Sequence, residues 1–276
     1  MIVFLRSLAF NIAFFTWMAL ASVLLSFSLL LPRPHLLAIM RWFLGSIAFL
    51  ERTLAGIRYE VRGREHLPKG GCYLVGAKHQ SAWETMKLLL LFDDPAVALK
   101  KELLKMPLWG SYARQTGMIM VDRAARTRAL SSLMEGAQRV AAEGRQIVIF
   151  PQGTRTAPGT NHPYRVGIGL LYERLKVPIV PMALNSGLYW PRRSFIKYPG
   201  TIVIEFLPPI PPGLERYAAM IELEQRLEAA TDRLVVEAGG PPCPPRPHPP
   251  ESAGRSKGKG RTGSRLGMGE KNDRAV

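Results

Sequence analysis

The stretch CYLVGAKHQSAWETMKLLLLF, residues 72–92, joins one short apolar run to a second one through a polar turn. The first run, residues 72–77, is typical of a buried strand, and the second, residues 86–92, is typical of a helix. His79 is therefore expected in a turn between a strand and a helix. In open α/β sheets, ligands and reacting groups gather in such turns at the carboxyl ends of strands. The stretch predicts an α/β fold and makes His79 the first candidate for a functional side chain.

Glu84 follows His79 by five residues, an offset that would put the two side chains on different faces of one continuous helix. We therefore place His79 before the helix. Ser81 is a good N-cap residue, and Ser81 and Glu84 have the spacing of a capping box, so the helix is expected to begin at Ala82. Two roles for Glu84 follow, and they are compatible. It caps the helix, or it accepts the ring N–H of His79 and orients a catalytic base.

The composition narrows the class of protein and the kind of partner. With 276 residues and a hydrophobic content of 47%, the chain can form one large domain or two small ones. Its formal net charge of +16 favours anionic partners, either nucleic acid or anionic lipid. The two cysteines, Cys72 and Cys243, make neither a disulfide framework nor a cysteine metal cluster, and no His-Glu-x-x-His pattern occurs. We expect no metal and no other cofactor.

The first fifty residues are strongly apolar. Residues 7–31 carry no charged side chain, and as a helix they would exceed a hydrocarbon core of about 30 Å. A cleaved signal peptide is the weaker alternative, since its apolar region is usually about 7–15 residues long. After a Pro-Arg-Pro break, residues 35–50 form a second apolar stretch that is too short for an ordinary span. Either the first helix spans and the second lies at the interface, or both form a re-entrant hairpin. Residues 1–52 are thus predicted to be a two-helix membrane anchor.

Positive charge predicts the orientation of this anchor. Only Arg6 precedes the uncharged run, whereas six arginines follow it: Arg33, Arg41, Arg52, Arg58, Arg62 and Arg64. Because basic residues stay on the cytoplasmic side, the body of the protein should face the cytoplasm from the inner membrane.

The rest of the chain alternates short apolar runs with helical segments. Seven runs are expected to be strands: residues 57–61, 72–77, 96–99, 118–121, 146–150, 179–184 and 201–207. The clearest helices are residues 81–92, 127–142 and 214–236. This pattern predicts an α/β domain over residues 53–238, with a mainly parallel or mixed sheet flanked by helices. Residues 239–276 include 15 Pro or Gly and few large apolar side chains, and are expected to be a disordered basic tail.

Three further stretches could carry chemistry. The turn PQGTR, residues 151–155, follows an apolar strand, and its glycine, amides and arginine could bind an anion, although a solvated arginine in an ordinary turn is the simpler explanation. Residues 99–107 contain clustered lysines at a strand end, which would add positive potential to the edge of the sheet that carries His79. Such a run is more often a solvated helix face or a membrane-contacting patch. In residues 177–185, prolines flank a strand, which packing alone explains.

Taken together and in this order, these stretches resemble the glycerolipid acyltransferase family, particularly the bacterial 1-acyl-glycerol-3-phosphate acyltransferases. The family pattern His-x-x-x-x-Asp is matched by His79 and Glu84, and Phe-Pro-Glu-Gly-Thr-Arg resembles residues 150–155. The other two blocks resemble residues 100–123 and 177–181. The resemblance covers roughly residues 58–209. Glu84 stands where aspartate is commoner, and Gln152 replaces the usual glutamate, which hints at a different acceptor.

The resemblance implies the transfer of a fatty acyl group from acyl-CoA or acyl-ACP to the hydroxyl of 1-acyl-glycerol-3-phosphate, giving phosphatidic acid. His79 would be the general base, and Glu84 would hold its tautomer. The implied substrate-binding residues are Lys100, Arg123, Gly153, Thr154 and Arg155. Lys100 and Arg155 would hold the acceptor phosphate, with Arg123 a weaker candidate, and the backbone around Gly153 would help with the oxyanion. Since no Gly-x-Ser-x-Gly occurs, direct transfer is expected rather than an acyl-serine intermediate.

Two related enzymatic functions and one function of a different class stay open as alternatives. The enzyme could acylate a different lysolipid, such as a lyso-aminolipid, or it could be a lipid esterase that uses His79 to activate water. A nucleic-acid binder would also explain the basic charge. However, the apolar start and the lack of any nucleic-acid-binding motif favour anionic membrane lipid as the partner and argue against nucleic acid.

Overall fold

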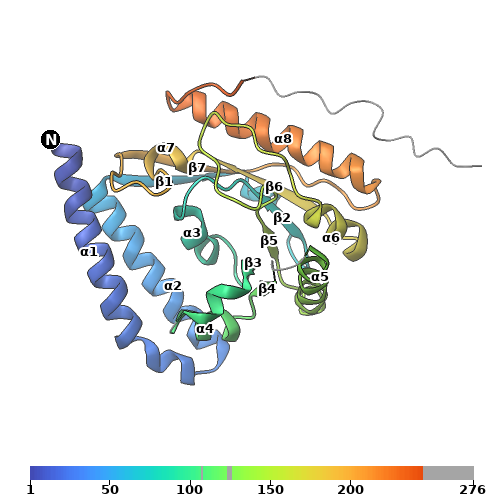
Figure 1. Ribbon diagram of the computed structural model, residues 1–276, viewed down its shortest axis with the longest axis horizontal. Helices are drawn as coiled ribbons and strands as arrows, with labels where there is room; N and C mark the ends of the chain where they lie inside the picture. Colours follow the sequence, from blue (N-terminus) through green and yellow to red (C-terminus); the bar gives the residue numbers. More distant parts are fainter. Residues whose placement is uncertain (107, 123–125, 245–276) are drawn as a thin grey trace, which may run out of the picture. The chain divides into compact units, whose positions relative to one another are not determined.

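The computed structural model describes residues 1–106, 108–122 and 126–244 (Figure 1). Arg123 and the tail from residue 245 onward, both part of the sequence expectations, lie outside this description. Residues Met1–Pro245 form one compact unit, which includes the apolar helices at the start of the chain. The proposed boundary near residue 52 stays a prediction.

A seven-stranded sheet forms the centre of the described chain. Its strands are β1 (Ile57–Arg62), β2 (Leu74–Ala77), β3 (Ala96–Lys100), β4 (Ile119–Val121), β5 (Ile147–Ile149), β6 (Ile179–Leu184) and β7 (Gly200–Phe206). Their order is β1-β7-β6-β2-β5-β3-β4. Neighbouring strands are parallel except β6 and β7, which pair antiparallel. The prediction of a mixed, mainly parallel sheet is therefore confirmed.

Helices cover both faces of this sheet. They are α1 (Ile2–Leu24), α2 (Arg33–Leu50), α3 (Trp83–Leu91), α4 (Trp109–Gln115), α5 (Arg126–Ala142), α6 (Gly167–Leu175), α7 (Ser186–Tyr189) and α8 (Arg216–Glu237). Successive side chains of a strand point to opposite faces, so Leu74 joins the core under α5, α6 and α8, while Val75 joins the core under α1 and α3 (Figure 1). Burial on both faces is the reason that the central strands are continuous apolar runs in the sequence.

The apolar start of the chain folds as two helices, as expected, but the first begins at Ile2 rather than after Arg6. Arg6 is accommodated because its Nε donates to the carbonyl of Leu54 at 3.0 Å. α1 ends at Leu24, a 3₁₀ turn follows at Ser26–Leu30, and α2 then begins at Arg33. By length and composition, α1 is the one helix of the described chain that could cross a membrane.

Both ends of α1 are fixed to the α/β body. Near its start, Ser7 Oγ accepts a hydrogen bond from the Lys197 amide at 2.9 Å. Beyond its end, the carbonyl of Leu25 accepts from the Tyr112 hydroxyl at 2.9 Å, and the carbonyl of Leu29 accepts from Gln115 at 3.0 Å. The helix therefore lies along the body, with only part of its surface covered.

Candidate active site

His79 lies two residues beyond the carboxyl end of β2. Because β2 is parallel to β5 and β6, the turns that follow these three strands meet at one edge of the sheet. The carbonyl of His79 accepts a hydrogen bond from the Thr156 amide at 2.8 Å, which joins the first turn to the turn after β5. The structure thus brings the turn of His79 and the turn of residues 151–155 together.

The carboxylate of Glu84 is the centre of the hydrogen bonds in this turn. Its Oε1 lies 2.8 Å from His79 Nδ1 and accepts from the amides of Gln80 and Ser81, each at 2.8 Å. Its Oε2 accepts from the Ser186 hydroxyl at 2.8 Å. Glu84 is fully buried, yet four donors satisfy both of its oxygens. An acceptor at this position requires the proton of His79 to be on Nδ1, so Nε2 carries the lone pair.

The capping box expected at the start of this helix is only partly present. α3 begins at Trp83, one residue later than expected, so its N-cap is Ala82, which makes no side-chain cap hydrogen bond. Glu84 accepts from the Ser81 amide as predicted, but Ser81 Oγ accepts from the Trp83 amide at 3.1 Å rather than from the amide of Glu84. The oxygen that bonds to His79 thus also holds the turn in front of the helix.

The imidazole of His79 packs against one aromatic ring and stays partly exposed. It stacks on Phe150 with the ring centroids 4.1 Å apart. Its side chain keeps 17% of its exposure, whereas Glu84 has none. Within the described part of the chain, no group hydrogen bonds to His79 Nε2, which leaves this nitrogen accessible to a substrate hydroxyl.

The turn after β5 needs its glycine. Gly153 has φ +67°, and a Cβ there would lie 2.6 Å from Nε of Arg165. The Gly153 amide donates to the carbonyl of Phe150 at 2.9 Å, so an oxyanion donor in this turn has to be another amide. Thr154 and Arg155 follow and are half-buried, and the Arg155 carbonyl accepts from Arg192 at 3.1 Å.

The lysine block lies at the same edge of the sheet. Lys100 is the last residue of β3 and is exposed. Since β3 is parallel to β5 and β5 to β2, Lys100 is at the edge that carries His79, two strands away. The binding roles of Lys100, Gly153, Thr154 and Arg155 stay predictions.

A buried ion pair beside this turn was missed by the sequence analysis. Lys78 Nζ lies 2.6 Å from a carboxylate oxygen of Glu228 in α8, and both side chains are 2% exposed. Glu228 also accepts from the amide of Gln152 at 3.2 Å and from the Tyr164 hydroxyl at 2.7 Å. Gln152 is therefore a buried partner of Glu228. A carboxylate of α8 thus lies beside position 152, where the family pattern has a glutamate.

A second buried pair joins α3 to the end of α2. Lys87 Nζ lies 2.7 Å from Glu51 Oε2, which also accepts from the Trp83 indole at 2.9 Å. Desolvation raises the pKa of Glu51, and the charge of Lys87 opposes that shift. Desolvation likewise lowers the pKa of Lys87 against the pull of Glu51. This pair fixes the helix that carries Glu84 to the N-terminal helices.

Comparison with known proteins agrees with this arrangement. The family profile described as Acyltransferase matches residues 58–185, the segment that contains both turns. The 1-acyl-sn-glycerol-3-phosphate acyltransferase of Pseudomonas aeruginosa is 37% identical over 189 residues, which are 68% of this chain and 73% of that enzyme. The chain belongs to the acyltransferase family.

More distant members extend the likeness. The 1-acyl-sn-glycerol-3-phosphate acyltransferase alpha of Mus musculus is 32% identical to this acyltransferase over 162 residues, which are 58% of this chain and 57% of the mouse enzyme. The crystal structure of the 1-acyl-sn-glycerophosphate acyltransferase from Thermotoga maritima matches with a TM-score of 0.67 at 22% identity. The match covers 83% of this chain and 95% of that one. The structural match shows that the two share a fold.

Two residues of the site, Ser186 and Glu228, were not predicted from the sequence of this acyltransferase. Ser186 directly follows Asn185 after β6, so the rule that reacting groups gather at carboxyl ends of strands could have pointed to it. Glu228 lies in a helix rich in charged residues, where no local pattern separates a buried carboxylate from exposed ones.

Proposed function

We propose that the protein transfers a fatty acyl group from an acyl thioester to the free hydroxyl of 1-acyl-glycerol-3-phosphate, giving phosphatidic acid. The observation that carries the proposal is the pairing of His79 Nδ1 with the buried carboxylate of Glu84, on a His79 side chain that is itself 17% exposed. The sequence likeness to 1-acyl-sn-glycerol-3-phosphate acyltransferases supplies the substrate class.

The chemistry can be followed at the atoms of His79. Nε2 takes the proton of the acceptor hydroxyl while the hydroxyl oxygen attacks the thioester carbonyl. The tetrahedral oxyanion then collapses, the C–S bond breaks, and the leaving thiolate takes the proton back from the imidazolium. Glu84 stabilises the positive charge that appears on the ring in between. Arg155 and Lys100, on the same edge of the sheet, would hold the acceptor phosphate, Arg through a bidentate fork and Lys as a point charge.

The burial of Gln152 bears on the alternative acceptor. Gln152 is 1% exposed and its amide donates to Glu228, so the change from glutamate is explained by packing and needs no change of substrate. This favours the lysophosphatidic acid acceptor over a lyso-aminolipid.

We further propose that α1 and α2 attach the protein to the inner membrane, with the active site on the cytoplasmic side. Large apolar side chains of α1 are exposed, among them Ile12 at 60% and Phe15 at 65%. Because both ends of α1 contact the same body, an arrangement within one leaflet fits better than an ordinary span. In that arrangement His79 receives a lysolipid directly from the bilayer.

The test is a donor-by-acceptor screen with the purified full chain in detergent. Radiolabelled acyl-CoA and acyl-ACP are each combined with 1-acyl-glycerol-3-phosphate, with a lyso-aminolipid or with water alone. We expect labelled phosphatidic acid, and its loss in His79→Ala. If labelled free fatty acid were the main product, the protein would be an esterase. If the acyl group were transferred only to the lyso-aminolipid, that lipid and not 1-acyl-glycerol-3-phosphate would be the acceptor.

A further inference from the structure

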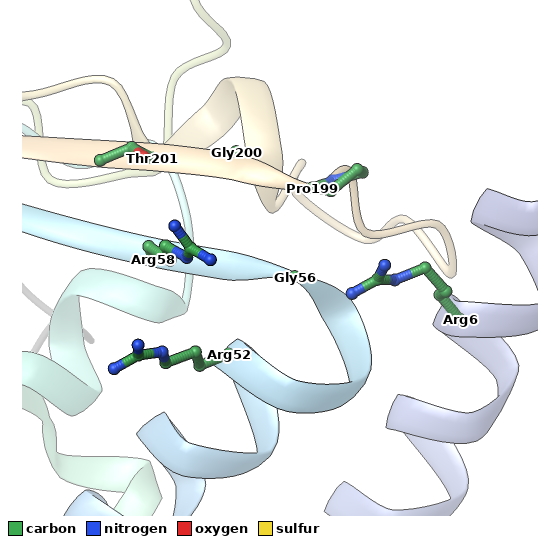
Figure 2. A pocket seen from close by; sticks show the side chains of 7 residues that line it. All are labelled: Arg6, Arg52, Gly56, Arg58, Pro199, Gly200 and Thr201. Atoms are coloured by element: carbon green, nitrogen blue, oxygen red, sulfur yellow. The ribbon is translucent and has the colours of Figure 1, made fainter.

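A cluster of three arginines lies outside the active site. Arg6 of α1, Arg52 of the turn after α2 and Arg58 of β1 line a pocket of about 280 Å³ (Figure 2). No carboxylate of the described residues forms a salt bridge with any of them, because nearby Glu51 is paired with Lys87 and Glu60 with Arg62. Three guanidinium groups with no neutralising partner make this pocket attractive to an anion.

The backbone keeps the pocket open. Gly56 has φ +73°, and a Cβ there would lie 2.6 Å from a terminal nitrogen of Arg6. Figure 2 shows the Arg6 side chain reaching from α1 toward Gly56. Gly200, at the start of the neighbouring strand, has φ +152° and also lines the pocket. A side chain at either position would be strained; at Gly56 it would fill the space beside Arg6, and at Gly200 it would meet the ring of Tyr189.

Exposed aromatic side chains stand close to the cluster along the chain. Phe4 lies two residues before Arg6, is 52% exposed and contacts the ring of Phe195, itself 45% exposed, with centroids 5.7 Å apart. Tyr198, just before the strand that lines the pocket, is 45% exposed, and Phe49, one turn before Arg52, is 65% exposed. Arginines next to exposed aromatic rings at the ends of apolar helices are typical of the headgroup level of a membrane.

We propose that this pocket binds the phosphate of an anionic phospholipid headgroup. The proposal rests on the membrane attachment proposed above. A phosphate matches the guanidinium fork, and the apolar surfaces of α1 and α2 begin beside the pocket, as lipid chains below a headgroup would require.

The pocket lies at the edge of the sheet that carries His79. β1 and β7 are parallel to each other, and β7 is antiparallel to β6. The amino ends of β1 and β7 therefore lie at the same edge of the sheet as the carboxyl end of β2, which carries His79. A lipid phosphate held by the arginines would keep that edge against the membrane surface.

The experiment offers the full chain a mixture of two dye-labelled vesicle populations, phosphatidylcholine alone and phosphatidylcholine with phosphatidylglycerol. The ratio of protein floating with each population is measured for the wild type, for R52Q/R58Q and for R174Q. Arg6 is left in place because it also bonds to Leu54. Arg174 is an exposed arginine of α6 away from the pocket and serves as the matched control.

We expect the double variant to lose preference for the anionic vesicles by up to about 25-fold, from roughly fivefold per basic residue near an anionic surface. R174Q should keep the wild-type ratio, and the total floating fraction should stay unchanged in all three. An equal loss in R174Q, or no loss in R52Q/R58Q, would overturn the proposal. Failure of every protein to float would instead refute membrane attachment itself.

A second arm separates lipid phosphate from the phosphates of a soluble donor. The KM for acyl-CoA is measured for the same three proteins in detergent. An unchanged donor KM supports the lipid assignment. If R52Q/R58Q had a raised KM for acyl-CoA but the same ratio of protein on the two vesicle populations, the pocket would bind the donor, and the proposal of a lipid phosphate would be wrong.

Discussion

Gln152 departs from the family pattern at a buried position. Its amide donates to Glu228, and Glu228 neutralises Lys78, so the buried site holds one positive and one negative charge. A glutamate at position 152 would add a second carboxylate to this site, where desolvation makes an unpaired charge costly.

Gln152→Glu is therefore expected to lower the free energy of unfolding by about 1–3 kcal/mol, the usual cost of an unsatisfied buried group. The measurement is thermal unfolding of the purified proteins in one detergent. The matched control is the double variant Q152E/E228Q, which exchanges the two residues and should recover much of the loss. Equal stability of Gln152→Glu and wild type would show that Glu228 does not take the place of the family glutamate.

The loop before β7 contacts α1 through the backbone of Lys197, whose side chain is buried within the same loop. Lys197 is 3% exposed and its Nζ donates to the carbonyls of Ser194 and Phe195 at 2.6 and 3.2 Å. Burial lowers the pKa of Lys197 from 10.5 to about 8. Above pH 8 the folded protein has released this proton, while the unfolded chain still binds it up to about pH 10.5. Its contribution to stability therefore rises with pH over that window.

Comparison of the wild type with Lys197→Met isolates this contribution from that of other lysines. The difference in free energy of unfolding, wild type minus variant, should increase between pH 8 and pH 10 by at most about 1.4 kcal/mol per pH unit. Melting curves in detergent at several pH values measure it as a widening difference in Tm. A difference that stays constant over this range would mean that Lys197 is not desolvated.

The elements were largely predictable from the sequence, and the partnerships between them were not. Each predicted strand occurs within two residues of its expected ends, because strands buried on both faces leave a continuous apolar run. The turn of His79 was also predictable, since local spacing determines it. Contacts such as Ser186 with Glu84, or Glu228 with Lys78, join residues more than one hundred positions apart. They depend on strand order and helix docking, which local periodicity does not encode.

The N-terminal helices serve both the fold and the proposed membrane attachment. Phe10, Leu36 and Ile47 are fully buried, so removing α1 and α2 would open the core as well as remove the anchor. Substitutions on the exposed face separate these two effects.

I12E/F15E should weaken membrane attachment while changing Tm little, because both side chains are already exposed. The measurement is the fraction of full-length protein that stays with membranes after carbonate extraction. Tyr217→Glu, at a residue of α8 that is 49% exposed, is the matched control and should stay attached like the wild type. Release of all three proteins by carbonate would mean that the helices do not enter the membrane.

His79 and Glu84 are proposed to act as one unit in acyl transfer. The most direct measurement is kcat for the wild type, His79→Ala, Glu84→Gln and the double variant, together with Tm for each. In Glu84→Gln the amide oxygen can keep the hydrogen bonds of Oε1, and the amide nitrogen can donate to Ser186, so Tm should change little. Loss of the charge should lower kcat by up to about 10⁴-fold, and the double variant should be no slower than His79→Ala. Near-normal turnover in Glu84→Gln, or rate losses that multiply in the double variant, would contradict the account.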